Sequence, residues 1–331
     1  MIRVRQDTET PLTTLATPFG ALRYLYARSG DSMESGTVGQ DYIAFRNDAA
    51  RVTFAVCDGV GQSFIGELAA RILGDGLVEW LWEAPRPPDA VTFASQVRTA
   101  LNALTDEGKR QVRAFQLPPH LPPLIVQALE NQREYGSESM FVAGRIELGS
   151  SESWIALAWL GDSPIAAIDI NGHLVDLGPQ GHTSERWNAL MGVKGQIHAW
   201  VGSAENVARV MGYSDGLGLS HPPTEDDLGR LGALWRLSPP ADDAALFDVR
   251  LAPRPEPAAA KILAPPMRAT EAPLVLLPEP VAAVTEREPA QPEPTPLEGW
   301  QRAALVGLTS LALTLFMVKW LVEQGHVQSD S

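Results

Sequence analysis

The sequence has one cysteine in 331 residues, Cys57, which excludes an intrachain disulfide framework and a cysteine-rich zinc site. Cys57 lies in the apolar run RVTFAVC, where burial raises a thiol pKa, so it is expected to pack rather than act as a nucleophile. Basic residues are also few. The 26 Lys and Arg against 40 Asp and Glu give a net charge of -14, which argues against a nucleic-acid surface.

The chain also lacks the glycine motifs that hold nucleotide phosphates. Neither GxxxxGK[ST] nor GxGxxG occurs, and no lysine follows Gly59 and Gly61, so a phosphate loop is excluded there. The first ten residues, MIRVRQDTET, lack the apolar stretch of a secretory signal. A βαβα alternation is absent as well, because the helical patterns come in the middle with strand patterns on both sides. This order favours antiparallel sheets covered by helices.

Eight segments are predicted as strands, because β-branched and aromatic residues stand there between turn signals. They are Ala21–Arg28, Asp41–Arg46, Arg51–Cys57, Met140–Leu148, Trp154–Leu160, Pro164–Asp169, Val207–Tyr213 and Ala244–Leu251. Apolar residues at helical spacing predict helices after Ser63 and over Val91–Phe115, and a third is expected over Leu124–Asn131. Hairpin turns are predicted at NDAA, between the second and third strands, and at Asn171-Gly172.

Proline is concentrated between Pro253 and Gly299, which holds 12 of the 27 prolines. Proline fixes φ and removes a backbone donor, so this stretch is interpreted as a linker, with one apolar island at Pro273–Val284. The following Ala303–Val318 is uncharged, and with Lys319 snorkelling beside Trp320 it is long enough to span a membrane. A buried core helix is the alternative, although it would show a polar stripe. We therefore expect an N-terminal extension at 1–18, a domain at 19–251, a linker at 252–300, a transmembrane helix at 301–322 and a tail at 323–331.

Aspartates recur where the predicted strands begin or end. They stand in the strings GQD, VCDG, LGDS, YSDG and ADD, at Asp41, Asp58, Asp162, Asp215, and Asp242 with Asp243. Each string alone is more often a turn. Together, strand ends could bring carboxylates to one place, where they repel unless a hard divalent cation neutralises them. Gly59, which has no Cβ, would let a backbone carbonyl approach the same cation.

The order of these strings resembles that of the PP2C-like family of metal-dependent serine/threonine protein phosphatases. Gln40-Asp41, VCDGVG, the GSES string at Gly136–Ser139, LGDS, SDG and the final DD follow the family's order over about Phe19 to Leu251. Each motif is weak, whereas the ordered set is specific. The opening SGDSMESGTVGQD looks more like bacterial members than eukaryotic ones.

The resemblance implies an α+β fold, a four-layer αββα sandwich of two antiparallel sheets flanked by helices. It also implies two metal ions, Mg²⁺ or Mn²⁺. One would be held by Asp58, Asp215 and Asp242, the other by Asp41, Asp58 and the Gly59 carbonyl, while Asp162 matches an aspartate associated with an accessory ion. Asp58 and Asp215 are the residues on which catalysis would depend most.

Such a pair of cations would share a water molecule, lower its pKa and direct it at the phosphorus of a phosphoserine or phosphothreonine. No covalent protein nucleophile is needed, which agrees with a packing role for Cys57.

The chain departs from the family's pattern around this core. Gly36 replaces an arginine that binds phosphate, Val60 a histidine suspected of protonating the leaving group, and Leu219 an aspartate that helps hold the accessory ion. Three arginines elsewhere could replace the lost one: Arg28, Arg46 and Arg186. The departures keep a second hypothesis open, a catalytically silent sensor or scaffold that binds a phosphoprotein at the membrane.

Charge around the predicted span sets the expected orientation. Four basic residues between Lys261 and Arg302 precede it and acidic residues follow it, which favours a cytoplasmic catalytic domain. The expected partners are phosphorylated serine/threonine proteins, among them a membrane-associated kinase or its substrates, and the lipid bilayer. Nucleic acid is not expected.

Overall fold

The fold is taken from a computed structural model that describes residues 1–119, 121–149, 152–235 and 237–252. The predicted linker, its apolar island, the predicted membrane helix and the tail lie outside these ranges from residue 253 onward. Within these ranges, no helix is both long enough and apolar enough to cross a bilayer.

Two antiparallel sheets form the centre of the fold. The larger contains β1 (Ile2–Arg3), β4 (Tyr42–Asn47), β5 (Arg51–Gly59), β6 (Glu138–Leu148), β7 (Ser153–Leu160) and β11 (His198–Ser203), in the order β1-β4-β5-β6-β7-β11. The short strands β9 (Arg186–Asn188) and β10 (Gly192–Lys194) extend it beside β6. The smaller contains β2 (Thr10–Thr17), β3 (Gly20–Ala27), β13 (Ala244–Leu251), β12 (Val207–Tyr213) and β8 (Ile165–Asp169), in that order. Every pairing between these strands is antiparallel.

The alternation of side chains along each strand divides the core into layers. Ile43 and Phe45 of β4 are buried between the two sheets, whereas Tyr42 and Ala44 are buried on the opposite face of the larger sheet. The Phe247 ring of the smaller sheet lies 4.8 Å from Phe45, centroid to centroid. The two sheets therefore pack face to face through one apolar layer.

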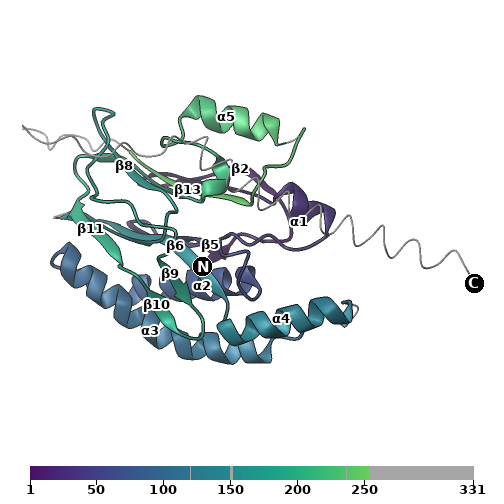
Figure 1. The fold of residues 1–331 in the computed structure, drawn as a ribbon. Coiled ribbons are helices and arrows are strands. Elements are labelled where there is room, and N and C mark those ends of the chain that lie inside the picture. The colour runs from purple at the N-terminus through teal and green to yellow at the C-terminus, as the bar shows by residue number, and fades with distance from the viewer. Residues whose placement is uncertain (120, 150–151, 236, 253–331) are drawn as a thin grey trace, which may run out of the picture. The chain divides into compact units, whose positions relative to one another are not determined.

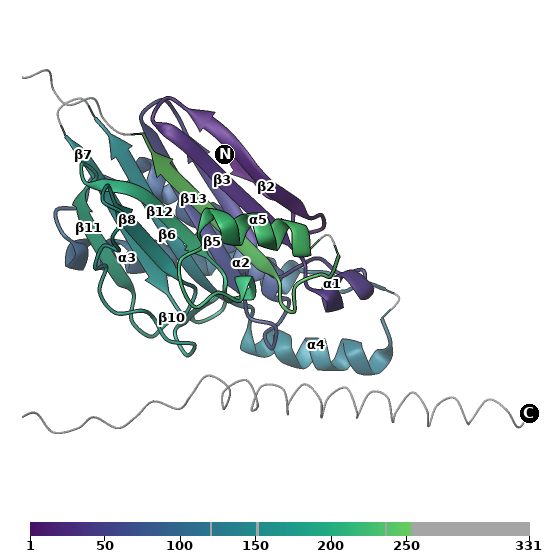
Figure 2. The same ribbon diagram turned by 90° about the horizontal axis from the view of Figure 1, so that it is seen from above.

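Helices cover the outer faces of both sheets (Figure 1). On the larger sheet lie α2 (Gly66–Glu83) and α3 (Ala90–Ala114), whose buried residues join its outer apolar layer. On the smaller sheet lies α5 (Glu225–Leu234), as Figure 2 shows. This helix packs on the sheet through Leu228 and Leu231. Two further helices, α1 (Gly30–Glu34) and α4 (Pro123–Tyr135), have no buried residue. The expected α+β class with two antiparallel sheets and helices is confirmed.

All eight predicted strands and all three predicted helices are present. The predictions match β12 and β13 at both ends, and the other elements have shifted ends. The helix expected after Ser63 begins at Gly66, because Val60 to Ile65 form a loop first. At Asn171-Gly172 the chain turns as expected, but its return strand amounts to a single bridge between Ile168 and Leu174. Residues 1–18, interpreted as an extension, contain β1 and β2 and pair into both sheets.

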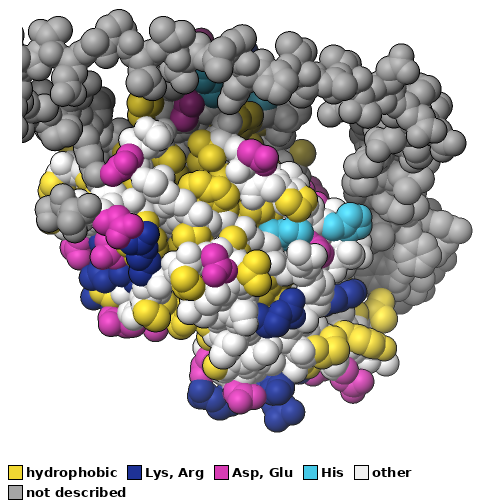
Figure 3. All heavy atoms as spheres, turned by 90° about the vertical axis from the view of Figure 1, so that its left-hand side faces the viewer, with side chains coloured by type: hydrophobic (Ala, Val, Ile, Leu, Met, Phe, Trp, Pro, Cys, Tyr) yellow, Lys and Arg dark blue, Asp and Glu magenta, His cyan; other side chains and the backbone are white. Residues whose placement is uncertain are grey.

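Charged side chains of both signs share the surface. On the face drawn in Figure 3, Lys and Arg stand beside Asp and Glu, with hydrophobic side chains between them. Elsewhere among the described residues, exposed charges of opposite sign form ion pairs, such as Arg3 with Asp75 at 2.9 Å and Arg5 with Asp7 at 2.6 Å.

Candidate active site

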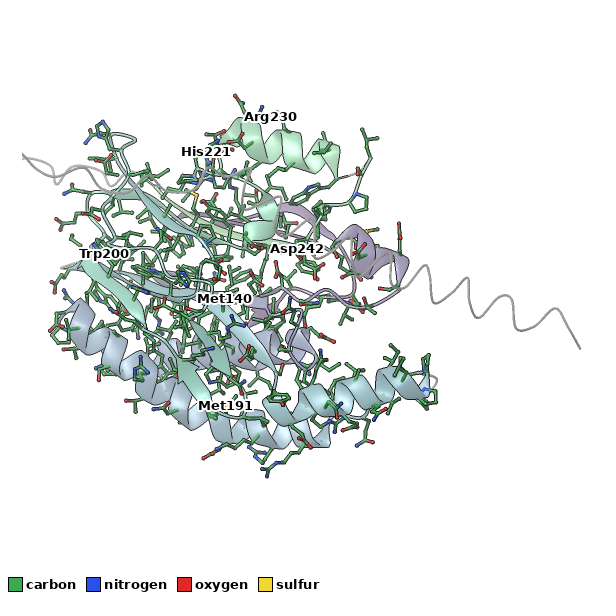
Figure 4. The ribbon with its side chains drawn as sticks, in the orientation of Figure 1. Met140, Met191, Trp200, His221, Arg230 and Asp242 are labelled. Atoms are coloured by element: carbon green, nitrogen blue, oxygen red, sulfur yellow. The ribbon has the colours of Figure 1, made fainter. Side chains whose placement is uncertain are left out.

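The predicted aspartates gather at one end of the two sheets. Asp41 directly precedes β4 and Asp58 lies near the end of β5, and because these strands are antiparallel, Tyr42 pairs with Cys57 at the same end. Asp162 follows β7, Asp215 follows β12 and Asp242 precedes β13. Figure 4 labels Asp242 and also Met140, the β6 residue that pairs with Asp58.

Asp58 stands at the electrostatic centre of this group. Burial raises the pKa of its carboxyl well above the ordinary value, and the nearby charges of Asp215, Asp242 and Asp162 raise it further. The pKa of Asp41 is also raised, by burial first and then by the charge of Asp58. The structure therefore brings Asp41, Asp162, Asp215 and Asp242 within electrostatic reach of Asp58.

Asp215 and Asp242 form the open side of the group, since both residues are exposed to solvent. Protein atoms around the two carboxyl groups nevertheless reduce their hydration, although each residue as a whole is exposed. This desolvation raises the pKa of Asp215 first, and the charges of Asp242 and Asp162 raise it further. The pKa of Asp242 is raised by the same desolvation and by Asp243 and Asp31, although its Oδ1 accepts a hydrogen bond from the backbone N–H of Asp243 at 2.8 Å. A ligand could thus reach the group from this side.

Two buried carboxylate oxygens in the group have no hydrogen-bond partner, Oδ2 of Asp41 and Oδ1 of Asp162. An unpaired buried carboxylate oxygen is costly unless a ligand satisfies it. Carboxylates are the hard oxygen donors that Mg²⁺ and Mn²⁺ prefer, so the residues present fit such cations. As the side chains of the described residues are placed, however, no three His, Cys, Asp or Glu form a group that could hold a metal ion. The ligand set stays a prediction.

Gly59 is the point where three backbone segments meet. A Cβ at Gly59 would lie 2.7 Å from the carbonyl oxygens of both Gln40 and Gly66, so no other residue fits without moving the backbone. The backbone around Asp58 is tied down too, because Ser139 Oγ donates a hydrogen bond to the Asp58 carbonyl at 2.8 Å. Gly59 therefore fixes the distance between the segments that carry Asp41 and Asp58.

Hydrogen bonds from the GSES string, Gly136–Ser139, hold the loop between β5 and α2, which runs from Val60 to Ile65. Ser137 Oγ donates to the Ile65 carbonyl at 2.7 Å and accepts from the Ala69 N–H at 3.0 Å, while Ser63 Oγ accepts from the Glu138 N–H at 3.0 Å. Ile65 has a φ of 48°, the left-handed region that a β-branched residue rarely adopts. The sequence marked Ser137 only as part of the GSES motif and Ser63 only as the residue before a helix, and the hydrogen-bonding role of neither was predicted.

Asp243 differs from its neighbours because its carboxylate is already satisfied. Oδ1 accepts from the Ser29 N–H at 2.6 Å and Oδ2 from the Gln40 N–H at 2.5 Å. Asp243 thereby links the start of β13 to the segments before α1 and β4. Its role is to hold the backbone of the aspartate group in place.

The three arginines expected to replace the one missing at Gly36 all have partners. Arg28 pairs with Glu9 at 2.7 Å, and Arg186 pairs with Glu138 at 2.9 Å. Arg46 lies over the Trp82 ring, 4.0 Å from its centroid, towards the end of β4 opposite to Asp41. Arg46 is therefore too far along the strand for this role, whereas Arg28 and Arg186 remain candidates.

The comparisons with known proteins agree with the order of the motifs. Residues 30–238 match the sequence model of the family described as protein phosphatase 2C. No curated protein matches the chain. Similar solved structures include the serine/threonine phosphatase Stp1 from Staphylococcus aureus, 14% identical with a TM-score of 0.47, covering 74% of this chain and 98% of that one. RsbX in complex with magnesium is 12% identical with a TM-score of 0.47, covering 73% and 100%.

A bacterial serine phosphatase is likewise 12% identical with a TM-score of 0.47, covering 71% of this chain and 98% of that one. At these identities the family assignment rests on the sequence model, which spans well over half of the chain. The chain belongs to the protein phosphatase 2C family of serine/threonine phosphatases.

Proposed function

We propose that this phosphatase is metal-dependent and that Mg²⁺ or Mn²⁺ binds at the aspartate group. Asp58, Asp215 and Asp242 would hold one ion, and Asp41, Asp58 and the Gly59 carbonyl the other, with Asp162 available to an accessory ion. The observation that supports this most is the gathering of mutually repelling carboxylates, two with buried unpaired oxygens, at one end of both sheets. Divalent cations bound there would supply an activated water for attack on the phosphorus of a phosphoserine or phosphothreonine.

The chain's own residues would position this chemistry. Four other aspartates raise the pKa of Asp58, and Asp58 in turn raises the pKa of Asp41, which suits a residue shared between two ions. Ser139 and Asp243 hold the backbone segments that carry these carboxylates. Cys57 is fully buried and its thiol pKa is raised by that burial, so it packs and does not attack the substrate.

The test compares hydrolysis of a phosphothreonine peptide, with Mn²⁺, by the wild type, Asp58→Asn and the control Asp106→Asn. Asp106 is exposed on α3 and outside the group, so its variant makes the same charge change elsewhere. We expect Asp58→Asn to lose about 100-fold or more and the control to keep its activity. Equal activity in all three would exclude a catalytic role for Asp58.

A calorimetric titration with Mn²⁺ separates this proposal from the silent-scaffold hypothesis. The proposal requires heat of binding in the wild type and its loss in Asp58→Asn. A domain that has lost its site would bind no metal and hydrolyse nothing.

We also propose that the uncharged stretch at Ala303–Val318 anchors the chain in a membrane, with the phosphatase domain on the cytoplasmic side. The anchor would raise the effective concentration of the domain near membrane-bound phosphoproteins, such as a kinase or its substrates. Fractionation at alkaline pH tests this, because a spanning chain stays with the membrane and one lacking residues 301–322 does not. Release of the full chain would contradict the anchor.

A further inference from the structure

A partly open cavity of about 430 Å³ adjoins the aspartate group. Its walls come from β8, from the loop that follows β8 and from the loop that follows η1 (Asp215–Leu217), and Asp162 forms part of them. Asp162 thus belongs both to the aspartate group and to the cavity. A substrate whose phosphate lies at the group would therefore have this cavity beside it.

The walls combine apolar surface with carboxylates. Leu174, Leu177 and Leu219 line the cavity, and the Leu174 side chain is largely exposed there. Asp176 also lines it. Its Oδ1 accepts a hydrogen bond from the Gly178 N–H at 2.9 Å, which leaves the second oxygen of this exposed carboxylate for a ligand.

Positive charge is scarce in the same walls. No Lys or Arg is among the described residues that line the cavity, and the one histidine there, His221, has its Nδ1 3.8 Å from Oδ2 of Asp227 outside the cavity. With the exposed carboxylate of Asp176 on its walls and no Lys or Arg among the described lining residues, the cavity is complementary to a cation that carries an apolar stem.

The loop that forms one wall is held against the site by backbone packing. A Cβ at Gly181 would lie 1.9 Å from the carbonyl oxygen of Gly161, the residue before Asp162. At the start of the loop, the Asp169 carboxylate accepts hydrogen bonds from the N–H groups of Asn171 and His173, both at 2.8 Å. The cavity is therefore formed before any ligand enters, which lowers the cost of binding.

We propose that this cavity binds the side chain of a lysine or arginine close to the phosphorylated residue of the protein substrate. This inference rests on the proposed function. The aliphatic stem would lie along Leu174, Leu177 and Leu219, and the charged head would meet Asp176, in the way long basic side chains bury their stems and keep their heads hydrated. Asp176 would then be a specificity-determining residue.

The experiment measures kcat/KM of the full chain, with Mn²⁺, on phosphothreonine peptides that carry Lys or Glu at each position from three before to three after the phosphothreonine. We expect the wild type to prefer Lys roughly three- to fivefold at one position or more, mainly through KM, as for an ion pair near a surface. Asp176→Asn should remove that preference, and Asp176→Lys should reverse it towards Glu. Asp106→Asn, the same charge change on α3, should retain it.

Hydrolysis without a preference for Lys, or a preference that survives both Asp176→Asn and Asp176→Lys, overturns the inference and leaves the proposed function standing. Failure of the wild type to hydrolyse any peptide overturns the proposed function, and the inference with it. Reversal of the preference in Asp176→Lys also shows that the variant is folded.

Discussion

Neighbouring aspartates have opposite roles in this site. Asp243 accepts two backbone hydrogen bonds and is buried, whereas Asp215 is exposed and its pKa is raised by its surroundings and by other carboxylates. Asp243 therefore stabilises the folded protein, whereas the charged carboxylate of Asp215 destabilises it. Their substitutions should separate stability from activity.

Asp215→Asn should reduce phosphopeptide hydrolysis by about 100-fold or more, because the residue would no longer offer a charged ligand. Its metal-free thermal unfolding midpoint should equal or exceed that of the wild type, since a repelling charge is gone. Activity assays and calorimetric melts check the two statements. A clearly lower midpoint would mean that Asp215 is structural.

Asp243→Ala should lower the free energy of unfolding by about 2 to 4 kcal/mol, because the N–H groups of Ser29 and Gln40 lose their acceptor. Urea denaturation measures this. An unchanged midpoint would contradict the supporting role of Asp243.

The raised pKa values also predict how stability depends on pH. Asp41, Asp58, Asp215 and Asp242 have folded-state pKa values above their unfolded values, which lie near 4. The folded protein then binds more protons than the unfolded chain above that pH, so the free energy of unfolding falls as pH rises. Groups with lowered pKa values, such as Glu185, have already given their full stability above about pH 5.

With chelator present, the thermal midpoint should therefore fall from about pH 5 towards pH 8, and Mn²⁺ should raise it and flatten the decline. Asp58→Asn should have a shallower decline than the wild type. A midpoint that rises with pH in the chelated protein would contradict the raised pKa values.

The sequence indicated the aspartates of the site but not the residues that hold them. Aspartates at strand ends can be recognised in the sequence because each stands where a run of apolar residues ends. The roles of Ser137, Ser139 and Gln40 depend on which loops meet in space, as do the close backbone contacts of Gly59. Short polar residues in loops carry no periodic signal that would reveal such contacts.

At the scale of the elements, strands and helices with a strong hydrophobic pattern were predicted from the sequence, and those with a weak pattern were missed. β5 and β7 are apolar over nearly their whole length because both of their faces are covered. By contrast, β2 is an edge strand of threonines with a proline, and β11 is half-buried along most of its length. α5 is short and contains two glycines, so its helical pattern is weak.

Replacing each of two helical glycines by alanine should change the stability of the protein in opposite directions. A Cβ at Gly108 of α3 would lie 2.6 Å from the Ala189 backbone oxygen, whereas one at Gly76 of α2 would meet only the ends of the Leu104 side chain. Alanine gains about 1 kcal/mol of helix propensity over glycine in either helix. Gly108→Ala should nevertheless destabilise the protein, because the backbone of Ala189 has to move.

Gly76→Ala should be neutral or stabilising, since the Leu104 side chain can rotate away. Denaturant unfolding of the two variants checks both signs. A stabilising Gly108→Ala would show that α3 does not pack tightly on the segment around Ala189.

At the scale of the whole molecule, two sheets packed face to face place the ends of β5 and β12 and the starts of β4 and β13 at one site. Carboxylates from residues 41 to 242 meet there because antiparallel pairing alternates starts and ends at the same end of the sheet. The order of the motifs in the sequence predicted that these carboxylates come together. It did not predict that, of the longer helices in the described residues, α5 alone covers the smaller sheet. The central claim is that this meeting point holds the cations on which the phosphatase depends.

That claim is tested most directly by the rate of phosphothreonine-peptide hydrolysis by the purified chain, measured after chelation and again after Mn²⁺ or Mg²⁺ is restored. We predict that hydrolysis is lost with chelator and recovered on addition of either or both cations in the wild type, but not in Asp58→Asn. Full hydrolysis in the presence of chelator would contradict the account.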